Sequence, residues 1–365
     1  MYSGRLRVHY PANQGQGEDG ERGSGQRLVL RTEQDWQRNV EAVEVSDDGT
    51  AWDFQLTHVH HHLQCKPCLV AGDQLTWSEG SNLLWIVDAD PPQEVYPHFF
   101  SGSAGRLSSV QELPSARLSQ GHRLRIYIPA GYEENVLKRY PVVYVYDGQN
   151  LFFPYEAFLG AEWQLDETLD RLDAMNLIDR TMVVGVYSED RNRDYTHPGY
   201  ELYGQALVEE VKAWVDERYR TLPDPSSTAV MGSSLGGVMA LHLAWEHPQI
   251  FGNAACLSSA FGWNDDLLER VHRDPLAGRE NLRIYLDSGW PGDNYEVTLS
   301  MAAALIERGF HYGRNLMHLA FPQGRHNESA WGSRVHLPIQ LFSGKIRRLA
   351  EARREREVPP PQPPG

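Results

Sequence analysis

The sequence lacks the long apolar segments that membrane insertion and secretion require. No run of about 18 or more apolar residues occurs, which argues against a membrane-spanning helix. The first residues, "MYSGRLRVHYPANQG", contain no apolar core of the kind found in secretory signal peptides. We therefore expect a cytoplasmic protein without a membrane partner.

Cysteine and excess positive charge are also scarce. The three cysteines, Cys65, Cys68 and Cys256, form an odd, low number that fits a reducing compartment without disulfide bonds. The formal net charge of −15 argues against nucleic acid as the main partner. The stretch "THVHHHLQCKPC" has one cysteine pair instead of the two ligand pairs of a structural zinc site, so we expect no metal and no cofactor.

The chain has 365 residues, which is enough for two domains. In residues 1–92, short alternating segments such as "AWDFQLTHV" are separated by turn signals such as "SDDGT", and no helical period occurs. This pattern predicts a small all-β sandwich domain. Residues 93–115 are rich in Pro, Gly and Ser, which predicts a linker.

Residues 116–350 show a different pattern, in which apolar runs alternate with amphipathic segments. "YPVVYVYDG" and "TMVVGVYS" are typical of strands covered on both faces, and "YGQALVEEVKAWVDERY" is typical of a helix. Such alternation predicts an α/β fold with a mainly parallel sheet and helices on both sides. The Pro-rich end, residues 351–365, is predicted to be a disordered tail.

A serine lies between glycines where one of these strands meets a helix. Residues 232–236 read "GSSLG", which fits Gly-x-Ser-x-Gly with Ser234 in the centre. In a nucleophile elbow this sharp turn raises the serine hydroxyl above the sheet, and glycines on either side avoid a steric clash. The following helix directs its N-terminus at the reacting group. Because a strand precedes the motif and a helix follows, we predict that Ser234 is a nucleophile.

A serine nucleophile needs a base and an acid, which follow it in the order acid, then histidine, in an α/β-hydrolase sheet. His326, in "PQGRHNESAW", lies in a polar loop just beyond a late strand, and we predict that it is the base. The acid should follow the strand "RIYLDSG". Asp293, in the loop beyond that strand, is favoured by its position, and Asp287 at the strand end and Glu296 remain alternatives.

Two backbone amides are expected to stabilise the oxyanion of the reaction. One belongs to Leu235, directly after the nucleophile, and the other to Gln149 in "YVYDGQNLF", where Gly148 allows a close approach of the backbone. An anionic substrate group has a candidate partner in Arg191 or Arg193 of "EDRNRDYT". The residues that we expect to bind substrate are Gly148, Asn150, Trp163, Arg193, Trp290 and Trp331.

Several stretches together resemble the Putative esterase family of α/β-hydrolases. This family includes esterase D, enterochelin-esterase-like proteins, feruloyl and acetyl-xylan esterases, and mycolyltransferases. The stretches are "RLRIYIPAGY", "YPVVYVYDGQNLF", "VMGSSLGGVMALHLAWEHPQIFG", "LDSGWPGDN" and "GRHNESAWGSRV". The sandwich-like N-terminal region is similar to a domain of the enterochelin-esterase-like branch.

The resemblance implies an α/β-hydrolase fold and assigns roles to residues of this chain. Ser234 would be the nucleophile, His326 the base and Asp293 the acid, with the Gln149 and Leu235 amides as oxyanion donors. One departure concerns the acid, because the loop "GWPGDN" is longer than the Gly-x-x-Asp form of some members.

Together these features predict a serine carboxylic-ester hydrolase that acts through an acyl-enzyme. Its substrate would be a small-molecule or carbohydrate ester: a short acyl ester, a feruloyl or acetyl ester of a sugar, or a siderophore-type ester. Two alternatives remain, an acyltransferase that uses the same site and a non-catalytic glycan- or siderophore-binding protein. The sequence also allows a homodimer.

Overall fold

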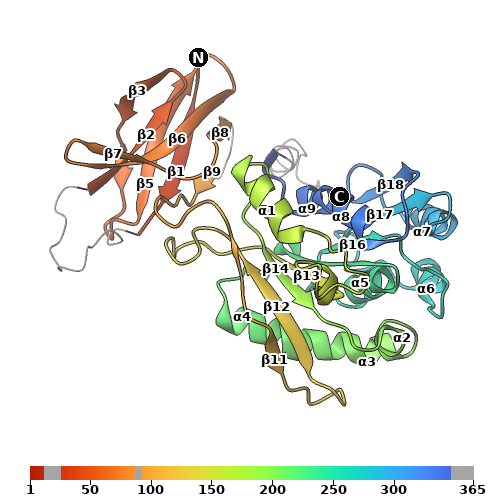
Figure 1. Ribbon diagram of the computed structural model, residues 1–365. Helices are drawn as coiled ribbons and strands as arrows, with labels where there is room; N and C mark the ends of the chain where they lie inside the picture. The colour runs from red at the N-terminus through yellow and green to blue at the C-terminus, as the bar shows by residue number, and fades with distance from the viewer. Residues whose placement is uncertain (12–25, 87–92, 347–365) are drawn as a thin grey trace, which may run out of the picture.

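The computed structural model describes residues 1–11, 26–86 and 93–346, which form a β-rich module beside a larger α/β module (Figure 1). The tail predicted to be disordered, residues 351–365, lies outside the described residues. No helix within the described ranges is long and apolar enough to cross a membrane.

The N-terminal module consists of two small sheets that share one core. The strand orders are β4-β5-β1-β9 and β3-β2-β6-β7, with β8 paired to β6. Alternate side chains turn inward, among them Leu6, Phe54 and Trp85, which are fully buried. The strands are β1 (Tyr2–His9), β2 (Gln26–Thr32), β3 (Asp35–Val40), β4 (Glu44–Val45), β5 (Ala51–His58), β6 (His62–Ala71), β7 (Gln74–Trp77), β8 (Leu83–Ile86) and β9 (Gln93–Val95).

The stretch predicted as a linker, residues 93–115, contains three short strands. β9 pairs with β1, whereas β10 (Arg106–Leu107) and β11 (Gln111–Leu113) pair with β12 (His122–Ile128) of the larger module. The Pro, Gly and Ser residues of this stretch lie mostly between these strands, each of which is too short to give an alternating pattern. We propose that the module boundary falls between β9 and β10, where the chain leaves one sheet for another.

The larger module is built on a sheet in the order β10-β12-β14-β13-β15-β16-β17-β18. β12 is antiparallel to β14, and each later pair is parallel, which confirms the predicted α/β fold with a mainly parallel sheet. The further strands are β13 (Val142–Tyr146), β14 (Met182–Val186), β15 (Thr228–Ser233), β16 (Asn253–Leu257), β17 (Arg283–Trp290) and β18 (Leu316–Pro322).

Helices cover both faces of this sheet, as the apolar runs of its strands predicted. One core contains side chains of α3 to α7, and the other contains those of α1, α8 and α9. The helices are α1 (Leu165–Ala174), α2 (Arg191–Asp194), α3 (Gly199–Ala206), α4 (Ala213–Arg218), α5 (Leu235–Glu246), α6 (Leu267–Arg273), α7 (Tyr295–Glu307), α8 (Glu328–Arg334) and α9 (His336–Ser343). Because β13 to β18 run parallel to one another, their carboxyl ends lie at one edge of the sheet, where the loops that follow them meet.

Candidate active site

Ser234 occupies the sharp turn between β15 and α5. Its backbone has φ +55° and ψ −122°, a conformation that non-glycine residues rarely adopt. Two backbone hydrogen bonds hold the turn, because Ser234 N donates to Leu257 O at 2.9 Å and Ser234 O accepts from Ala260 N at 3.2 Å. This held, strained turn is the geometry that the motif predicted.

The glycines around Ser234 are required by close packing within the turn. A Cβ on Gly232 would lie 2.4 Å from Gly236 O, and a Cβ on Gly237 would lie 2.0 Å from the Ser259 hydroxyl. The chain therefore folds back on itself so tightly that side chains do not fit. This accounts for the first glycine of the motif, Gly232, whereas a Cβ on the second, Gly236, would meet its nearest neighbours at 3.3 Å.

Asp293 and His326 come together at the same edge of the sheet. Asp293 follows β17 and His326 follows β18, and Oδ1 of the aspartate lies 2.7 Å from Nδ1 of the imidazole. The Asp293 side chain is fully buried, whereas His326 keeps 35% of its side chain exposed. Asn327 ends the loop by accepting a hydrogen bond from Ala330 N, which starts α8 directly after the histidine.

The two loops that carry this pair touch through glycines. A Cβ on Gly289, near the end of β17, would lie 2.2 Å from Gly324 O, and Gln323, directly before Gly324, has a left-handed φ of +66°. The loop with Asp293 and the loop with His326 are thus fixed against each other at backbone distance. Among the residues that the structure describes, His326 is hydrogen-bonded to Asp293 but not to Ser234.

A buried serine holds the aspartate from the other side. Ser258 Oγ donates to Asp293 Oδ2 at 2.6 Å, and it accepts from Trp331 Nε1 at 2.9 Å and from Arg334 Nη2 at 2.6 Å. The amides of Gly289 and Asn294 also donate to Asp293. Burial alone would raise the pKa of Asp293, but these bonds and that of His326 bring it well below the ordinary value, so the carboxylate is ionised at neutral pH.

The two alternative acids lie in different surroundings. Asp287 is fully buried within β17, where Arg334 Nη2 lies 3.0 Å from its carboxylate and Tyr285 donates a hydrogen bond at 2.9 Å. Burial raises its pKa to about 6, against the opposing effect of Arg334. Glu296 is exposed in the first turn of α7. Of the three acids, only Asp293 is bonded to His326 within the described ranges.

The predicted oxyanion donors lie at the same edge. Leu235 is the first residue of α5, so its N–H has no acceptor within the helix. Gln149 is half-buried in a short 3-10 turn (Gly148–Asn150) after β13. A Cβ on Gly148 would lie 2.7 Å from the Gly185 backbone, so the glycine allows this turn to pack against β14. Gly148 thus has a packing role.

Of the two arginines considered for an anionic substrate group, Arg191 lies at the elbow. Its Nη2 donates to Ser233 O at 3.4 Å, and its Nε lies 3.1 Å from the buried Asp147 carboxylate. Arg193 instead makes two hydrogen bonds to the buried Asp194 beside it, at 2.8 and 3.0 Å. The Arg193 guanidinium is therefore occupied within its own loop, and of the two arginines considered it is Arg191 that lies near Ser234.

The tryptophans predicted to bind substrate divide into two kinds. Trp163 and Trp331 are buried, with ring centres 6.2 Å apart, and the Trp331 ring meets His326 edge to face at 5.0 Å. Trp290, directly after which the acid loop begins, is 54% exposed. Trp331 therefore supports the imidazole, Trp163 lies in the core behind it, and Trp290 is available to a ligand.

Asn150 and Ser258 show what sequence reasoning finds and misses. Asn150 is buried and bridges the 3-10 turn to α8, with Nδ2 3.3 Å from Glu328 Oε1. It was predicted as a substrate contact, and in the structure its side chain connects the 3-10 turn to α8.

Ser258 and Arg334 were not found from the sequence, because they lie 76 positions apart and form no local motif. The only signal was a second polar pair, "SS", directly after the strand "NAACL".

Comparisons with known proteins agree with this geometry. A family model described as Putative esterase matches residues 115–335. A curated relative, the uncharacterized protein YbbA of Bacillus subtilis (strain 168), is 25% identical over 159 residues, which are 42% of this chain and 62% of the relative. The chain thus spans about three-fifths of the length of the curated relatives it matches.

Solved structures show the same fold at low identity. A ferulic acid esterase aligns with a TM-score of 0.55 and 18% identity, covering 66% of this chain and 98% of that protein. The enterochelin esterase of Shigella flexneri aligns with a TM-score of 0.53 and 14% identity, covering 93% of this chain and 91% of that protein. The alignment with the enterochelin esterase covers 93% of this chain and therefore includes the N-terminal module. This likeness confirms the α/β-hydrolase fold preceded by a β-rich domain.

Proposed function

The chain belongs to the Putative esterase family, and from that premise we propose that it is a carboxylic-ester hydrolase with Ser234 as nucleophile, His326 as base and Asp293 as acid. The observation that carries the proposal is the 2.7 Å contact between His326 and a fully buried, ionised Asp293, at the sheet edge where Ser234 occupies its strained turn. Serine esterases require these three side chains in these relative roles.

The ionised Asp293 fixes the tautomer of His326 through their hydrogen bond. Because the pKa of Asp293 is low despite burial, its carboxylate stays ionised and accepts a hydrogen bond from the Nδ1–H group of His326. The other ring nitrogen, Nε2, is then unprotonated and can act as a base. Asp293 also stabilises the imidazolium that forms when the base takes a proton.

The reaction follows from these states. Ser234 Oγ attacks the ester carbonyl as Nε2 of His326 takes the hydroxyl proton, and the N–H groups of Leu235 and Gln149 stabilise the oxyanion. Collapse of the tetrahedral intermediate breaks the C–O bond, and His326 gives the proton to the departing alcohol. Water then attacks the acyl-enzyme with His326 again as base, which frees the acid and restores Ser234.

For the substrate we propose a small-molecule or carbohydrate ester with an aromatic or anionic group. Trp290 offers an exposed ring beside the acid loop, and Arg191, whose side chain is 40% exposed, offers a cation beside the elbow. A phenolate or carboxylate would match that guanidinium. The aligned structures are named as a ferulic acid esterase and an enterochelin esterase, and this proposal includes feruloyl and siderophore-type esters with short acyl esters.

The decisive experiment combines active-site labelling with a matched pair of serine variants. A fluorophosphonate probe should label wild type at one serine, and Ser234→Ala should lose both the label and at least about 10³-fold in kcat on p-nitrophenyl butyrate and methyl ferulate. Ser233→Ala, which changes the adjacent buried serine, serves as control and should keep the label. A folded wild type that neither reacts with the probe nor hydrolyses any ester would refute the proposal.

The same preparation tests the two other functions considered. Addition of an alcohol acceptor during turnover would give a new ester if the protein were an acyltransferase, and free acid if it were a hydrolase. Ligand affinity that persists in Ser234→Ala, with no hydrolysis by wild type, would indicate a binding protein.

A further inference from the structure

A cavity lies between the two modules, and none of the three proposed catalytic residues lines it. It has a volume of about 230 Å³. Two of its charged side chains, Lys138 and Arg180, lie a few residues before β13 and β14, on the side of the amino ends of these strands. Ser234, Asp293 and His326 instead follow the carboxyl ends of β15, β17 and β18. The cavity is therefore at the opposite edge of the sheet from the candidate active site.

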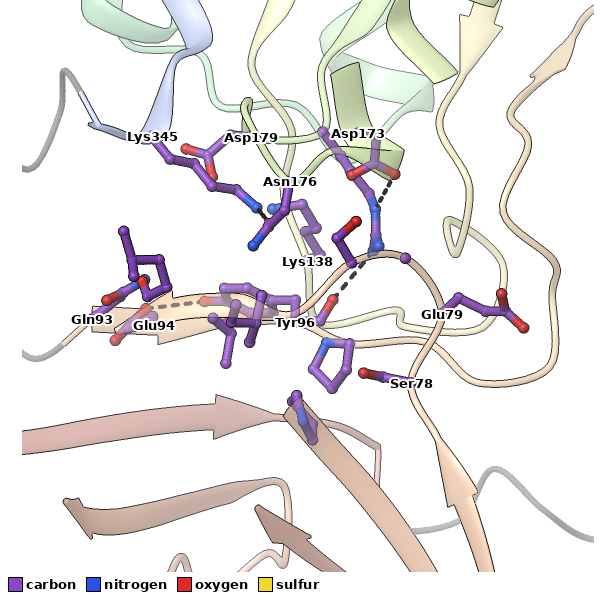
Figure 2. Close-up of a pocket in the computed structure, with 18 of the residues that line it drawn as sticks. Ser78, Glu79, Gln93, Glu94, Tyr96, Lys138, Asp173, Asn176, Asp179 and Lys345 are labelled. Carbon is purple, nitrogen blue, oxygen red and sulfur yellow. Dashed lines mark hydrogen bonds and ion pairs between the residues drawn. The ribbon is translucent and has the colours of Figure 1, made fainter. Parts of the chain in front are cut away.

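The two modules supply different walls of this cavity. Figure 2 shows Asp173, Asn176, Asp179 and Lys345 on the α/β side, facing Gln93, Glu94 and Tyr96 on the side of β9. Apolar side chains of the N-terminal module, among them Leu84 and Val95, complete the second wall. The cavity thus has a charged wall and a partly apolar wall.

Two of the three cations in the charged wall have polar partners. Arg180 Nε donates to Asp173 at 2.8 Å, and Nη1 of the same guanidinium donates to Tyr96 O at 3.3 Å. The Lys345 amine donates to the side-chain oxygen of Asn176. These contacts explain how two cations are held at the junction of the modules.

The third cation, Lys138, lies over two aromatic rings. Its amine lies 5.1 Å from the ring centre of Tyr96 and 5.4 Å from that of Tyr140. Among the described residues, no carboxylate forms an ion pair with it at 4.0 Å or less, although the field of Asp179 acts on it. Burial, with Arg180 and Lys345, lowers the pKa of Lys138 to about 8, against the opposing fields of Asp179 and Asp173.

We propose that this cavity binds a small organic acid with one carboxylate group, which pairs with Lys138 while its apolar part lies against Leu84, Val95 and Tyr96. A half-buried ammonium for which the described ranges supply no hydrogen-bond acceptor gains most from an anionic partner. The carboxylates of Glu79, Glu94, Asp173 and Asp179 also line the cavity, so a dianion such as phosphate would be repelled more strongly than a monocarboxylate. The site is independent of the proposed esterase chemistry.

The test uses the full chain with sodium benzoate as the probe, benzyl alcohol as the uncharged comparison and inorganic phosphate as the dianion. Isothermal titration calorimetry at pH 7 gives the affinity. The chain has four lysines, so [ε-¹³C]lysine labelling gives few signals in NMR, and Lys138→Arg assigns the one of interest. The matched variants are Lys138→Met and Arg139→Met, which remove neighbouring cations inside and outside the cavity.

We expect benzoate to shift the Lys138 signal and to bind wild type more tightly than benzyl alcohol or phosphate. Lys138→Met should weaken benzoate binding by about tenfold or more, while Arg139→Met changes it less than about twofold. Benzoate bound in the active site would leave the Lys138 signal unmoved. Equal binding by wild type and Lys138→Met, or no benzoate binding up to about 10 mM, would overturn the proposal. So would tighter binding of phosphate than of benzoate.

Discussion

Asp287 and Asp293 belong to neighbouring regions, the middle of β17 and the loop after it, and both side chains are fully buried near Ser258 and Arg334. Their environments act in opposite directions. Asp293 accepts hydrogen bonds from two backbone amides, a serine and the histidine, which lower its pKa, whereas burial dominates at Asp287 and raises its pKa to about 6.

The comparison shows that burial alone does not decide the role of a carboxylate. Asp287 accepts hydrogen bonds from the Tyr285 hydroxyl and the Ser258 amide and lies 3.0 Å from Arg334, yet burial within the strand outweighs them. A residue in the loop beyond the strand can collect the amides of the turn around it, and its carboxylate stays ionised next to the imidazole. This difference makes Asp293 suited to orient a base and Asp287 suited to bind Arg334.

The largest expected effect comes from neutralising each aspartate in turn, which tests whether Asp293 and Asp287 have different roles. Asp293→Asn should lower kcat on p-nitrophenyl butyrate by about 10³- to 10⁴-fold, because the imidazole loses its charged partner and the correct tautomer. Asp287→Asn should cost less than about tenfold in kcat. Steady-state kinetics on folded samples, checked by circular dichroism, gives both values. A larger loss in Asp287→Asn than in Asp293→Asn would reverse the two roles.

The next largest effect concerns stability. Arg334→Met leaves the Asp287 carboxylate buried without its cation, and the free energy of unfolding at pH 7 should fall by about 3–5 kcal/mol. Without the opposing field of Arg334, the pKa of Asp287 rises further above 6. Asp287 is protonated at low pH in both wild type and Arg334→Met. The difference in their free energies of unfolding should therefore shrink from pH 7 to pH 5.

Urea denaturation of wild type and Arg334→Met at pH 7 and pH 5 measures this difference in the free energy of unfolding. The wild-type sign follows from the same linkage: since the folded pKa of Asp287 exceeds its ordinary value of 3.8, the group contributes stability at low pH that is lost as pH rises to about 6. In a background of Asp287→Asn, Arg334→Met should cost the same at both pH values. A pH-dependent cost in that background would assign the effect to another group.

A smaller effect is expected at the serine that both regions share. Ser258→Ala removes the hydroxyl that donates to Asp293, and kcat should fall by about 10- to 100-fold with KM little changed. Ser259→Ala is the matched control, since it changes the next buried serine, which makes no bond to Asp293 within the described residues. If the two variants lose equal activity, general loosening of the loop explains the effect better than positioning of the acid.

The smallest effect should come from Trp331→Phe. This change keeps a ring beside His326 but removes the N–H that donates to Ser258. We expect kcat to fall by about threefold, since one neutral hydrogen bond in the support of Asp293 is lost. Trp163→Phe, in the core behind it, provides the comparison and should alter thermal stability more than kcat.

Much of the fold was predictable from local pattern. Continuous apolar runs identified β13, β14 and β15 because a strand covered on both faces has no polar side to show. The Gly-x-Ser-x-Gly turn was predictable because its cause is steric and lies within five residues. The cytoplasmic location and the homodimer stay predictions.

The side chains around the candidate site were less predictable, since they depend on tertiary contacts. Tryptophans 163, 290 and 331 look alike in sequence, yet only the first and last are buried. Arg191 and Arg193 differ by which neighbouring carboxylate is within reach, and a sequence does not state that. Ser258 joins three elements, so no window along the chain reveals it.

The glycine contact between residues 289 and 324 has a consequence for protein engineering. Since the two backbones meet where no methyl group fits, the loop with Asp293 and the loop with His326 have to be exchanged together. A graft that replaces one of them with the equivalent piece of a homologue, for instance to change acyl preference, needs its counterpart from the same donor. Insertions that lengthen only one segment would separate acid from base, whereas paired exchanges preserve their alignment.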